Sequence, residues 1–318
     1  MRPRCPDSSP SPCLTAMKKN LLGCVMTACL GFALTGLARE NGARPGATDN
    51  AAGHAQDDGA RCQPADESPS PWQPLEPGLD LGVFSAPEPS GSSDSKIRVL
   101  RIDSLRFDLR LMMASAANDG DPMTARQWCL ENGLVAAINA SMYQEDHRTS
   151  VALMRTRAHT NNNHLTKDKA VLAFDGLDEK VPGVQIIDRT CQDFDALANR
   201  YGSLVQSIRM VSCQGKNVWS PQPMKWSAAA IGIDFQGRIL FIFSRSPYTM
   251  HDLIDMLLEL PIGLKNAQYA EGGPEAQLYV RSGDTELEFC GSYEANFIED
   301  ESSKCTAPVP NVVGIARR

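Results

Sequence analysis

The segment spanning residues 228–243 constrains the fold of this chain more than any other. Residues 228–234 and residues 238–243 are two runs rich in apolar and small side chains, and Phe235-Gln236-Gly237 separates them. This arrangement predicts an antiparallel hairpin. In the second arm, residues 239–243 (sequence ILFIF) are apolar at every position, and therefore on both faces of the strand. Such a strand is predicted to lie in the middle of a sheet, because both of its faces must be covered.

The remaining patterns of the chain also favour strands over helices. Only two segments are predicted as helices: residues 122–132, which end at Gly133, and residues 249–260. Strands are predicted over residues 96–102, 106–111, 134–138, 203–211, 267–270 and 312–316, with a second hairpin over residues 277–289. The sequence therefore predicts an α+β fold, a single domain with a mixed β-sheet core and a few packed helices.

Residues 1–38 have the features of a bacterial-type secretory signal peptide. Met17, the expected true start, is followed by two lysines and then by an uncharged apolar run over residues 21–37 that ends in small residues. Cleavage after this region predicts a secreted or periplasmic protein with no stable membrane span. An uncleaved anchor and a lipoprotein are the alternatives, because the run approaches the length of a membrane span and contains Cys24 and Cys29.

Residues 39–95 are predicted to form a disordered linker. The segment is rich in Pro, Gly and Ser and has no apolar periodicity. It therefore cannot bury enough surface to offset the entropy that is lost on ordering. The folded unit is then predicted to be residues 96–318, a suitable length for one domain.

The charge of the chain argues against nucleic acid as a partner. The formal net charge is −7, and residues 1–38 contribute +3, which leaves −7 − 3 = −10 for residues 39–318. A general nucleic-acid binder needs clustered Lys and Arg to release counterions, and the sequence has no basic run of that kind. An isolated site for an anion is compatible with this charge.

The cysteines predict disulfides rather than a metal site. Six of them follow the signal-peptide region: Cys62, Cys129, Cys191, Cys213, Cys290 and Cys305. Export permits disulfides, and the two pairs that are local in sequence, Cys191–Cys213 and Cys290–Cys305, are the expected ones. Cys129 falls in a predicted helix and is expected to be a buried thiol. No Cys or His pair has zinc spacing, so neither a metal nor a cofactor is predicted.

Three clusters carry side chains suited to chemistry. The first, Asn139-Ala140-Ser141-Met142-Tyr143, stands at the end of a predicted buried strand, where a rigid backbone delivers Asn139 and Tyr143 to a site. The alternative is a turn at the Asn, with the Tyr covering the core. The tract at residues 159–164 (sequence HTNNNH) is rich in hydrogen-bonding groups and is expected to be a solvated loop rather than a platform for a sugar.

The second cluster, residues 245–252, follows the central strand and opens a predicted helix. Thr249 as the N-cap with Asp252 three residues later fits a capping box, which is a structural role for Asp252. In the functional interpretation, the free amides of the helix start bind an anion and Arg245 adds a bidentate clamp. His251 lies in the first turn, where the helix dipole disfavours its charged form. It is either a general base or a histidine without a chemical role.

The third cluster, Glu271-Gly272-Gly273-Pro274-Glu275, directly follows the predicted strand over residues 267–270. Gly272 and Gly273 let the backbone approach a ligand closely. Glu271 and Glu275 place two carboxylates across a turn, and cleavage of glycosidic bonds commonly uses such a pair. The alternative is a glycine turn with exposed acids.

Taken in this order, the motifs resemble those of the phosphodiester glycosidase family, and the resemblance extends over residues 96–318. Residues 139–143 resemble the family's Asn-Ala-Gly-Met/Phe-Phe/Tyr, and Gln206-Ser207-Ile208-Arg209 resembles its Gln-Ser-Gly-Pro. Glu271-Gly272-Gly273 is similar to the family's Asp-Gly-Gly. Arg245 stands where the family has an Arg after the central strand.

Several positions depart from the family's pattern. Ala228-Ala229 replaces an Arg-Thr pair, which removes a phosphate contact that Lys225 or Arg209 would have to supply. Glu271 replaces Asp and lengthens the side chain by one methylene. Glu275 replaces Ser and adds a charge beside the expected phosphate.

The resemblance implies an exported hydrolase that cleaves a glycosyl phosphodiester, which is a sugar-1-phosphate linkage, or a related glycosidic bond. Its implied general base or nucleophile is Glu271, with Glu275 or His251 as the partner and Asp252 as a further catalytic candidate. The alternatives are a catalytically degenerate glycan-binding or cell-envelope protein on the same scaffold, and a structural domain without a pocket.

The resemblance also implies how a carbohydrate or glycosyl-phosphate ligand is bound. The sugar is expected at Asn139 and Tyr143. The phosphate is expected at Arg209 and Arg245, with the backbone of Gly272 and Gly273 against the ligand. This reading requires that residues more than a hundred positions apart in sequence meet in one site.

Overall fold

The computed structural model describes residues 70–87, 95–117, 120–292 and 305–318. The predicted signal peptide and residues 39–69 of the predicted linker lie outside the described residues. Within them, no helix is long and apolar enough to cross a membrane.

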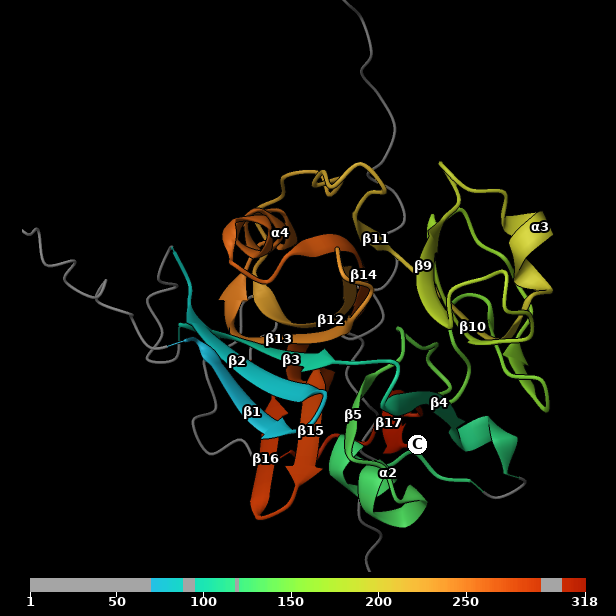
Figure 1. Cartoon of the computed structure of the whole chain (residues 1–318), viewed down its shortest axis with the longest axis horizontal. Helices are drawn as coiled ribbons and strands as arrows, with labels where there is room; N and C mark the ends of the chain where they lie inside the picture. The colour runs from blue at the N-terminus through green and yellow to red at the C-terminus, as the bar shows by residue number, and fades with distance from the viewer. Residues whose placement is uncertain (1–69, 88–94, 118–119, 293–304) are drawn as a thin grey trace, which may run out of the picture. The chain divides into compact units, whose positions relative to one another are not determined.

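Nearly half of the described residues lie in β-strands, which are arranged in three antiparallel sheets (Figure 1). The largest, which we call the central sheet, has seven strands. In spatial order they are β1 (Trp72–Glu76), β2 (Leu79–Ser85), β3 (Lys96–Ile102), β13 (Ile239–Tyr248), β12 (Trp226–Asp234), β14 (Leu264–Gly272) and β11 (Arg209–Val211). The predicted hairpin is confirmed as β12 and β13, and it lies in the middle of this sheet.

Two five-stranded sheets complete the fold. The β10 sheet has the order β7 (Thr160–Asn162), β6 (Met154–Arg155), β10 (Tyr201–Ser207), β8 (Ala170–Gly176) and β9 (Val184–Asp188). The β5 sheet has the order β16 (Thr285–Cys290), β15 (Gln277–Ser282), β5 (Ala136–Asn139), β17 (Asn311–Arg317) and β4 (Phe107–Met113). Residues 203–211, predicted as one strand, therefore divide between β10 and β11, which belong to different sheets.

The prediction of a mixed sheet core was wrong. Every strand pairing among the described residues is antiparallel. A parallel pair needs a long crossover, usually a helix, and this chain has few helices to supply one. The fold is mostly β, with helices in a minor role.

The linker prediction was also wrong over its last part. Residues 72–76 and 79–85 form β1 and β2, and β2 pairs along its whole length with β3. The side chains of Leu79, Leu81 and Phe84 are buried in the core. The high Pro and Gly content of the segment obscured this apolar run.

The helices carry their own start and stop signals. Helix α2 (Ala125–Asn132) begins at a capping box of Thr124 and Gln127 and ends at Gly133, whose φ is 62°. Helix α4 (Met250–Glu259) begins at Thr249, whose hydroxyl accepts a hydrogen bond from the Asp252 amide. Three shorter helical segments are η1 (Ala114–Ala116), α3 (Phe194–Ala198) and η2 (Gly273–Glu275).

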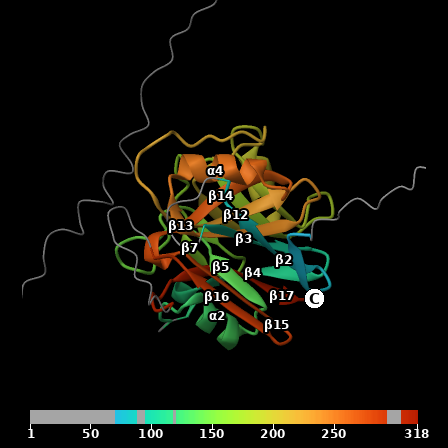
Figure 2. The same cartoon turned by 90° about the vertical axis from the view of Figure 1, so that its left-hand side faces the viewer.

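The central sheet is covered on both faces, as the sequence of β13 predicts. On one face, Leu240 and Ile242 pack with Leu253 and Leu257 of α4. On the other face, Phe241 and its neighbours pack against strands of the other two sheets. Figure 2 shows α4, the central sheet and the β5 sheet in succession. Side chains of the central sheet therefore point either toward α4 or toward the other sheets, and this decides which candidate residues meet.

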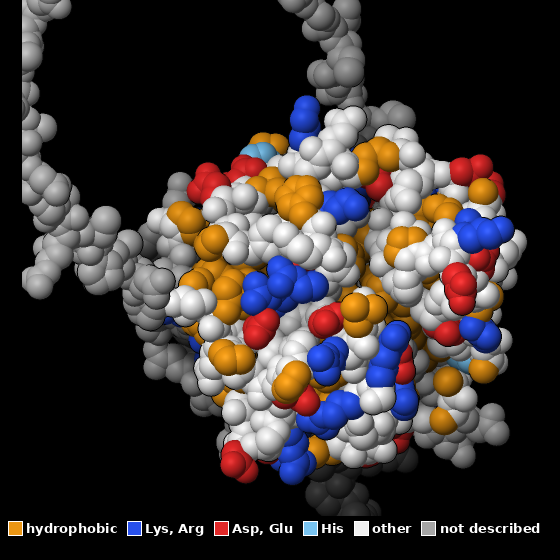
Figure 3. Space-filling view, in the orientation of Figure 1, with side chains coloured by type: hydrophobic (Ala, Val, Ile, Leu, Met, Phe, Trp, Pro, Cys, Tyr) orange, Lys and Arg blue, Asp and Glu red, His pale blue; other side chains and the backbone are white. Residues whose placement is uncertain are grey.

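Both predicted disulfides are confirmed, Cys191–Cys213 and Cys290–Cys305. Cys129 is a buried thiol in α2, as predicted. Cys62 lies outside the described residues. On the face shown in Figure 3, basic and acidic side chains are interspersed. Ion pairs between residues of different strands include Arg101 with Asp80 and Arg317 with Glu76.

Candidate active site

Strand β14 delivers Glu271 to the face of the central sheet that is opposite α4. Glu271 is paired with Ala229 of β12, and directly paired residues of antiparallel strands share a face. Ala229 belongs to the cluster that faces the other two sheets. The half-buried Glu271 carboxylate accepts a hydrogen bond from the Gly272 amide at 3.1 Å.

The two glycines after Glu271 are required by the geometry of the turn. A Cβ at Gly272 would lie 2.1 Å from the Tyr269 hydroxyl and 2.6 Å from the Trp226 ring. Gly273 has a φ of 69°, a left-handed conformation that glycine adopts without steric cost. The turn then forms η2 and ends at Glu275, so both carboxylates stand on one tight backbone segment.

The requirement at Gly272 makes a testable prediction. Gly272→Ala should lower the free energy of unfolding by about 1–3 kcal/mol, because the added methyl displaces Tyr269 or Trp226. Urea unfolding measures this loss. Gly183→Ala is the matched control, since a Cβ there meets no atom within 4 Å. Equal stability of the two variants would contradict the close approach at Gly272.

Asn139, at the end of β5, anchors this turn from the other side. Its amide nitrogen donates to the Glu275 carbonyl at 2.9 Å, and its amide oxygen accepts from the Gln277 amide at 2.7 Å. The side chain is buried, and both ends of its carboxamide are used on the main chain around Ala276. The contacts that the structure gives Asn139 therefore position the turn, and its contact with a sugar stays a prediction.

Tyr143 interacts with both carboxylates. Its ring is buried, and its hydroxyl is hydrogen-bonded to the Glu275 side chain. Burial raises the pKa of this phenol, and the charges of Glu275 and Glu271 raise it further. The hydroxyl is thus a protonated donor, held against one carboxylate and within the field of the other.

A second tyrosine, Tyr269, feels the charge of the same pair. The Tyr269 hydroxyl accepts a hydrogen bond from the Trp226 indole at 3.1 Å. Burial raises the pKa of Tyr269, as does the charge of Glu271 and, more weakly, that of Glu275. The sequence did not single out Tyr269, although it lies only two residues before Glu271.

Arg245 is linked to the turn by residues 291–292, which directly follow β16. Its Nε donates to the Ser292 hydroxyl at 3.2 Å, and the neighbouring Gly291 amide donates to the Ala276 carbonyl at 2.8 Å. Arg245 also lines a small cavity of about 110 Å³. The other lining residues are Arg98, Phe243, Glu288, Phe289, Cys290 and Cys305. This cavity includes neither of the two carboxylates.

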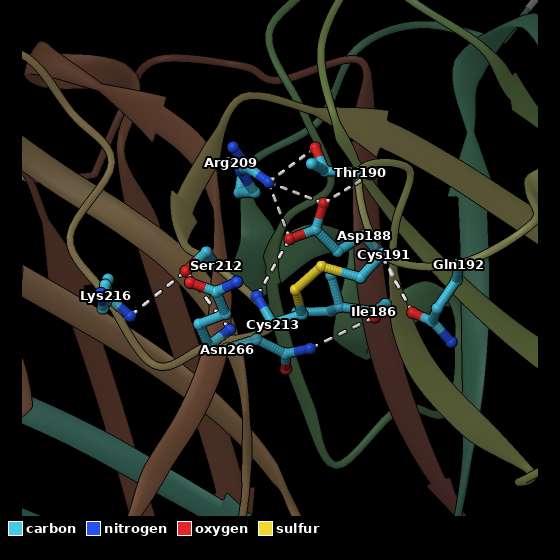
Figure 4. Close-up of a disulfide and its surroundings, with 11 residues drawn as sticks. Ile186, Asp188, Thr190, Cys191, Gln192, Arg209, Ser212, Cys213, Lys216 and Asn266 are labelled. Atoms are coloured by element: carbon cyan, nitrogen blue, oxygen red, sulfur yellow. Dashed lines mark hydrogen bonds and ion pairs between the residues drawn. A yellow bond between two sulfur atoms is a disulfide. The ribbon is translucent and has the colours of Figure 1, made fainter.

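Arg209 has a different partner from the one predicted. Its Nη1 donates to both oxygens of Asp188, at 2.7 and 2.8 Å, and to the Thr190 hydroxyl at 2.9 Å (Figure 4). Asp188 is buried and also accepts from the amides of Cys213 and Thr190. Arg209 therefore neutralises a buried carboxylate at the end of β9, and its role as a phosphate ligand stays a prediction that this pairing does not support.

The same cluster contains the one group of potential metal ligands found among the described residues. Asp188, Cys191 and Cys213 offer ligand atoms within 4.8 Å of one another. The two sulfurs are joined in a disulfide, and both Asp188 oxygens are hydrogen-bonded to Arg209. This donor set does not suit a metal ion.

His251 and Asp252 lie apart from the carboxylate pair. Both are on α4, which packs on the opposite face of the central sheet. His251 Nδ1 is 3.3 Å from an oxygen of Asp255, and the Asp252 amide bonds to Thr249. Their catalytic role stays a prediction, and their position on α4 does not support it. The helix-capping interpretation accounts for the Asp252 amide, and Asp252 is otherwise half-exposed.

Comparison with known proteins identifies the family to which the chain belongs. A sequence profile of the phosphodiester glycosidase family matches residues 132–316, a span that contains Asn139, Tyr143 and both carboxylates. None of the curated proteins matches this chain.

Two solved structures share the fold. One is the zebrafish N-acetylglucosamine-1-phosphodiester alpha-N-acetylglucosaminidase catalytic domain auto-inhibited by its pro-peptide. It is 12% identical with a TM-score of 0.55, and the match covers 76% of this chain and 85% of that chain. The other, a hypothetical protein from Synechocystis, is 13% identical with a TM-score of 0.50 and coverages of 76% and 62%. At these identities the likeness concerns the fold alone.

Proposed function

Because this chain belongs to the phosphodiester glycosidase family, we propose that it is a hydrolase that cleaves the bond between a sugar and a phosphodiester. The observation that carries the proposal is the turn from Glu271 to Glu275. Asn139 holds this turn by hydrogen bonds, and both carboxylates act on the buried hydroxyls of Tyr143 and Tyr269. Paired carboxylates are the groups with which most glycosidases act.

In the proposed reaction, the carboxylates act at the anomeric carbon. Phosphate is a good leaving group, so the reaction depends less on a general acid than on a base or nucleophile. Glu271 takes that role, as the residue that stands at the end of β14. Glu275 is its partner, and the Tyr143 hydroxyl fixes the orientation of Glu275 by donating a hydrogen bond to it.

A phosphate next to two carboxylates needs a positive partner. Arg245 is the cation that we propose for this role, because its Nε donates to the hydroxyl of Ser292, and the amide of the adjacent Gly291 donates to the Ala276 carbonyl at the end of the turn. Lys225, exposed one residue before β12, is the other candidate. Arg209 is excluded from the proposal, since it is committed to Asp188.

We further propose that the protein acts after export, as a domain that follows a signal peptide over residues 1–38. The two disulfides support an oxidising compartment. The position of β1 moves the start of the proposed domain from residue 96 to about residue 70.

Incubation of the purified full chain with a panel of sugar-1-phosphodiesters tests the function. Release of free sugar above the rate in buffer is the expected result. A second candidate function, binding of glycans without cleavage, is favoured by the commitment of Arg209 and by the small residues Ala228 and Ala229. Glycan binding by calorimetry without product after several days would select that candidate instead.

A further inference from the structure

The loop that follows Tyr143 presents a histidine that no motif singles out. Residues 144–149 leave the site after Tyr143 and return at Ser150, which forms a β-bridge with Tyr143. A tight turn is closed by hydrogen bonds from the His147 amide to the Gln144 carbonyl at 3.0 Å and from the Gln144 amide to the Thr149 carbonyl at 2.7 Å. His147 stands exposed at its corner.

This loop is held rigidly from within. The Asp146 carboxylate accepts hydrogen bonds from the amides of Arg148 and Thr149, at 3.0 and 2.8 Å, and from the Thr149 hydroxyl. Those bonds from Thr149, more than any other contact, lower the pKa of Asp146. The loop conformation is therefore fixed by the charged form of its own carboxylate.

The loop is also held from outside by the polar tract that the sequence predicted to be solvated. Asn161 donates to the Arg148 carbonyl at 3.0 Å and accepts from the Ser150 amide at 2.7 Å. Asn162 donates to the Ser150 carbonyl at 2.7 Å. The role of this tract in the structure is to support the loop that carries His147.

His147 has an unfavourable backbone conformation. Its φ is 51°, and the one other non-glycine residue with positive φ among those described is Asp175. A residue with a Cβ is disfavoured there relative to Gly, although Asn, Asp and His adopt this conformation more often than other types. Strain of this kind persists where the surroundings impose it, and such residues cluster at functional sites.

The imidazole of His147 lies against the ring of Tyr143. Its ring centroid is 5.4 Å from that of Tyr143, with the rings tilted by 48°. Tyr143 in turn is hydrogen-bonded to Glu275. The exposed imidazole therefore lies beside a buried tyrosine that feels the charge of both carboxylates.

We propose that His147 is a substrate-binding residue whose ring nitrogen donates a hydrogen bond to the phosphate of a glycosyl phosphodiester. This inference rests on the proposed function, because the phosphate is attached to the carbon at which Glu271 and Glu275 act. The carboxylates offer only acceptors to an anion, so a donor at their rim suits the phosphate better than the sugar.

The variants His147→Asn and His147→Gly separate ligand binding from structure. Both residues tolerate positive φ, so the melting temperature should stay equal or rise. At the same time, KM for the phosphodiester and the dissociation constant for N-acetylglucosamine 1-phosphate should each rise about tenfold. A merely structural role would not give a protein that is at least as stable and yet binds more weakly.

Asp175→Asn is the matched control. It relieves the same kind of strain at a site where the carboxylate pairs only with the exposed Arg157, and it should leave both binding constants unchanged. Unchanged constants in both His147 variants would overturn the inference. Calorimetry with N-acetylglucosamine 1-phosphate keeps it separate from the proposed function: wild-type binding without turnover refutes the hydrolysis, and absence of wild-type binding refutes the role of His147.

Discussion

Replacing Glu271 with Gln should lower the rate of sugar release roughly a thousandfold and leave the protein folded. The substitution keeps the size of the side chain and an oxygen that accepts the Gly272 amide, but it removes the negative charge. A base or nucleophile without that charge can neither take a proton from water nor attack the anomeric carbon. Steady-state kinetics together with the melting temperature measure the two effects separately.

The control for this prediction is Glu259→Gln. Glu259 is an exposed carboxylate at the end of α4, on the opposite face of the central sheet, and its loss should not change the rate. Turnover by Glu271→Gln at the level of the control would remove Glu271 from the mechanism. If Glu271→Gln is already unfolded at the temperature of the assay, the loss of rate reflects lost structure, and Glu271 has a structural role.

Arg209→Ala should produce the largest loss of stability, about 3 kcal/mol in the free energy of unfolding. The variant leaves the Asp188 carboxylate buried without its counter-charge, although the amides of Cys213 and Thr190 still bond to it. Arg318→Ala is the control, because Arg318 and Asp108 form an exposed pair that should contribute less than about 1 kcal/mol. Chemical denaturation compares the two, and equal losses would contradict the account.

The same pair predicts how stability depends on pH. Burial raises the pKa of Asp188, but the amides of Cys213 and Thr190 and the Arg209 guanidinium together outweigh it and hold the pKa below its usual value of 3.8. Asp188 therefore stabilises the fold fully above about pH 4, and this contribution is lost as the pH falls through the lowered pKa. Asp188→Asn should flatten the acid side of the stability curve. An unchanged acid side would show that Asp188 is not the group responsible.

Local sequence patterns predicted the parts of this fold whose signals are local. The residues of β3 match the predicted range, α4 begins at the predicted Thr249 cap, and both disulfides join cysteines that are near in sequence. The order of the strands could not be predicted, because β2 reaches its place in the central sheet only by pairing with β3 and, through it, β13. The antiparallel character of all three sheets likewise depends on long-range pairing.

For the candidate site, too, the sequence indicated local motifs but not the long-range packing that brings residues together or separates them. The sequence singled out Tyr143, Glu271 and Glu275, because each lies within a recognisable motif, and in the structure both carboxylates act on Tyr143. It could not show that α4 packs on the far face of the sheet, which separates His251 from the carboxylates. Nor could it show that Arg209 is taken by Asp188, a residue 21 positions earlier on another sheet. Which face a side chain occupies is set by tertiary packing.

Hydrolysis of a glycosyl phosphodiester in water enriched in oxygen-18 is the most direct test of the central claim. If Glu271 and Glu275 act at the anomeric carbon, the bond between carbon and oxygen breaks, and the heavy oxygen appears in the hydroxyl of the released sugar. Heavy oxygen in the phosphate product would mean attack at phosphorus, and it would contradict a glycosidase built on this pair of carboxylates.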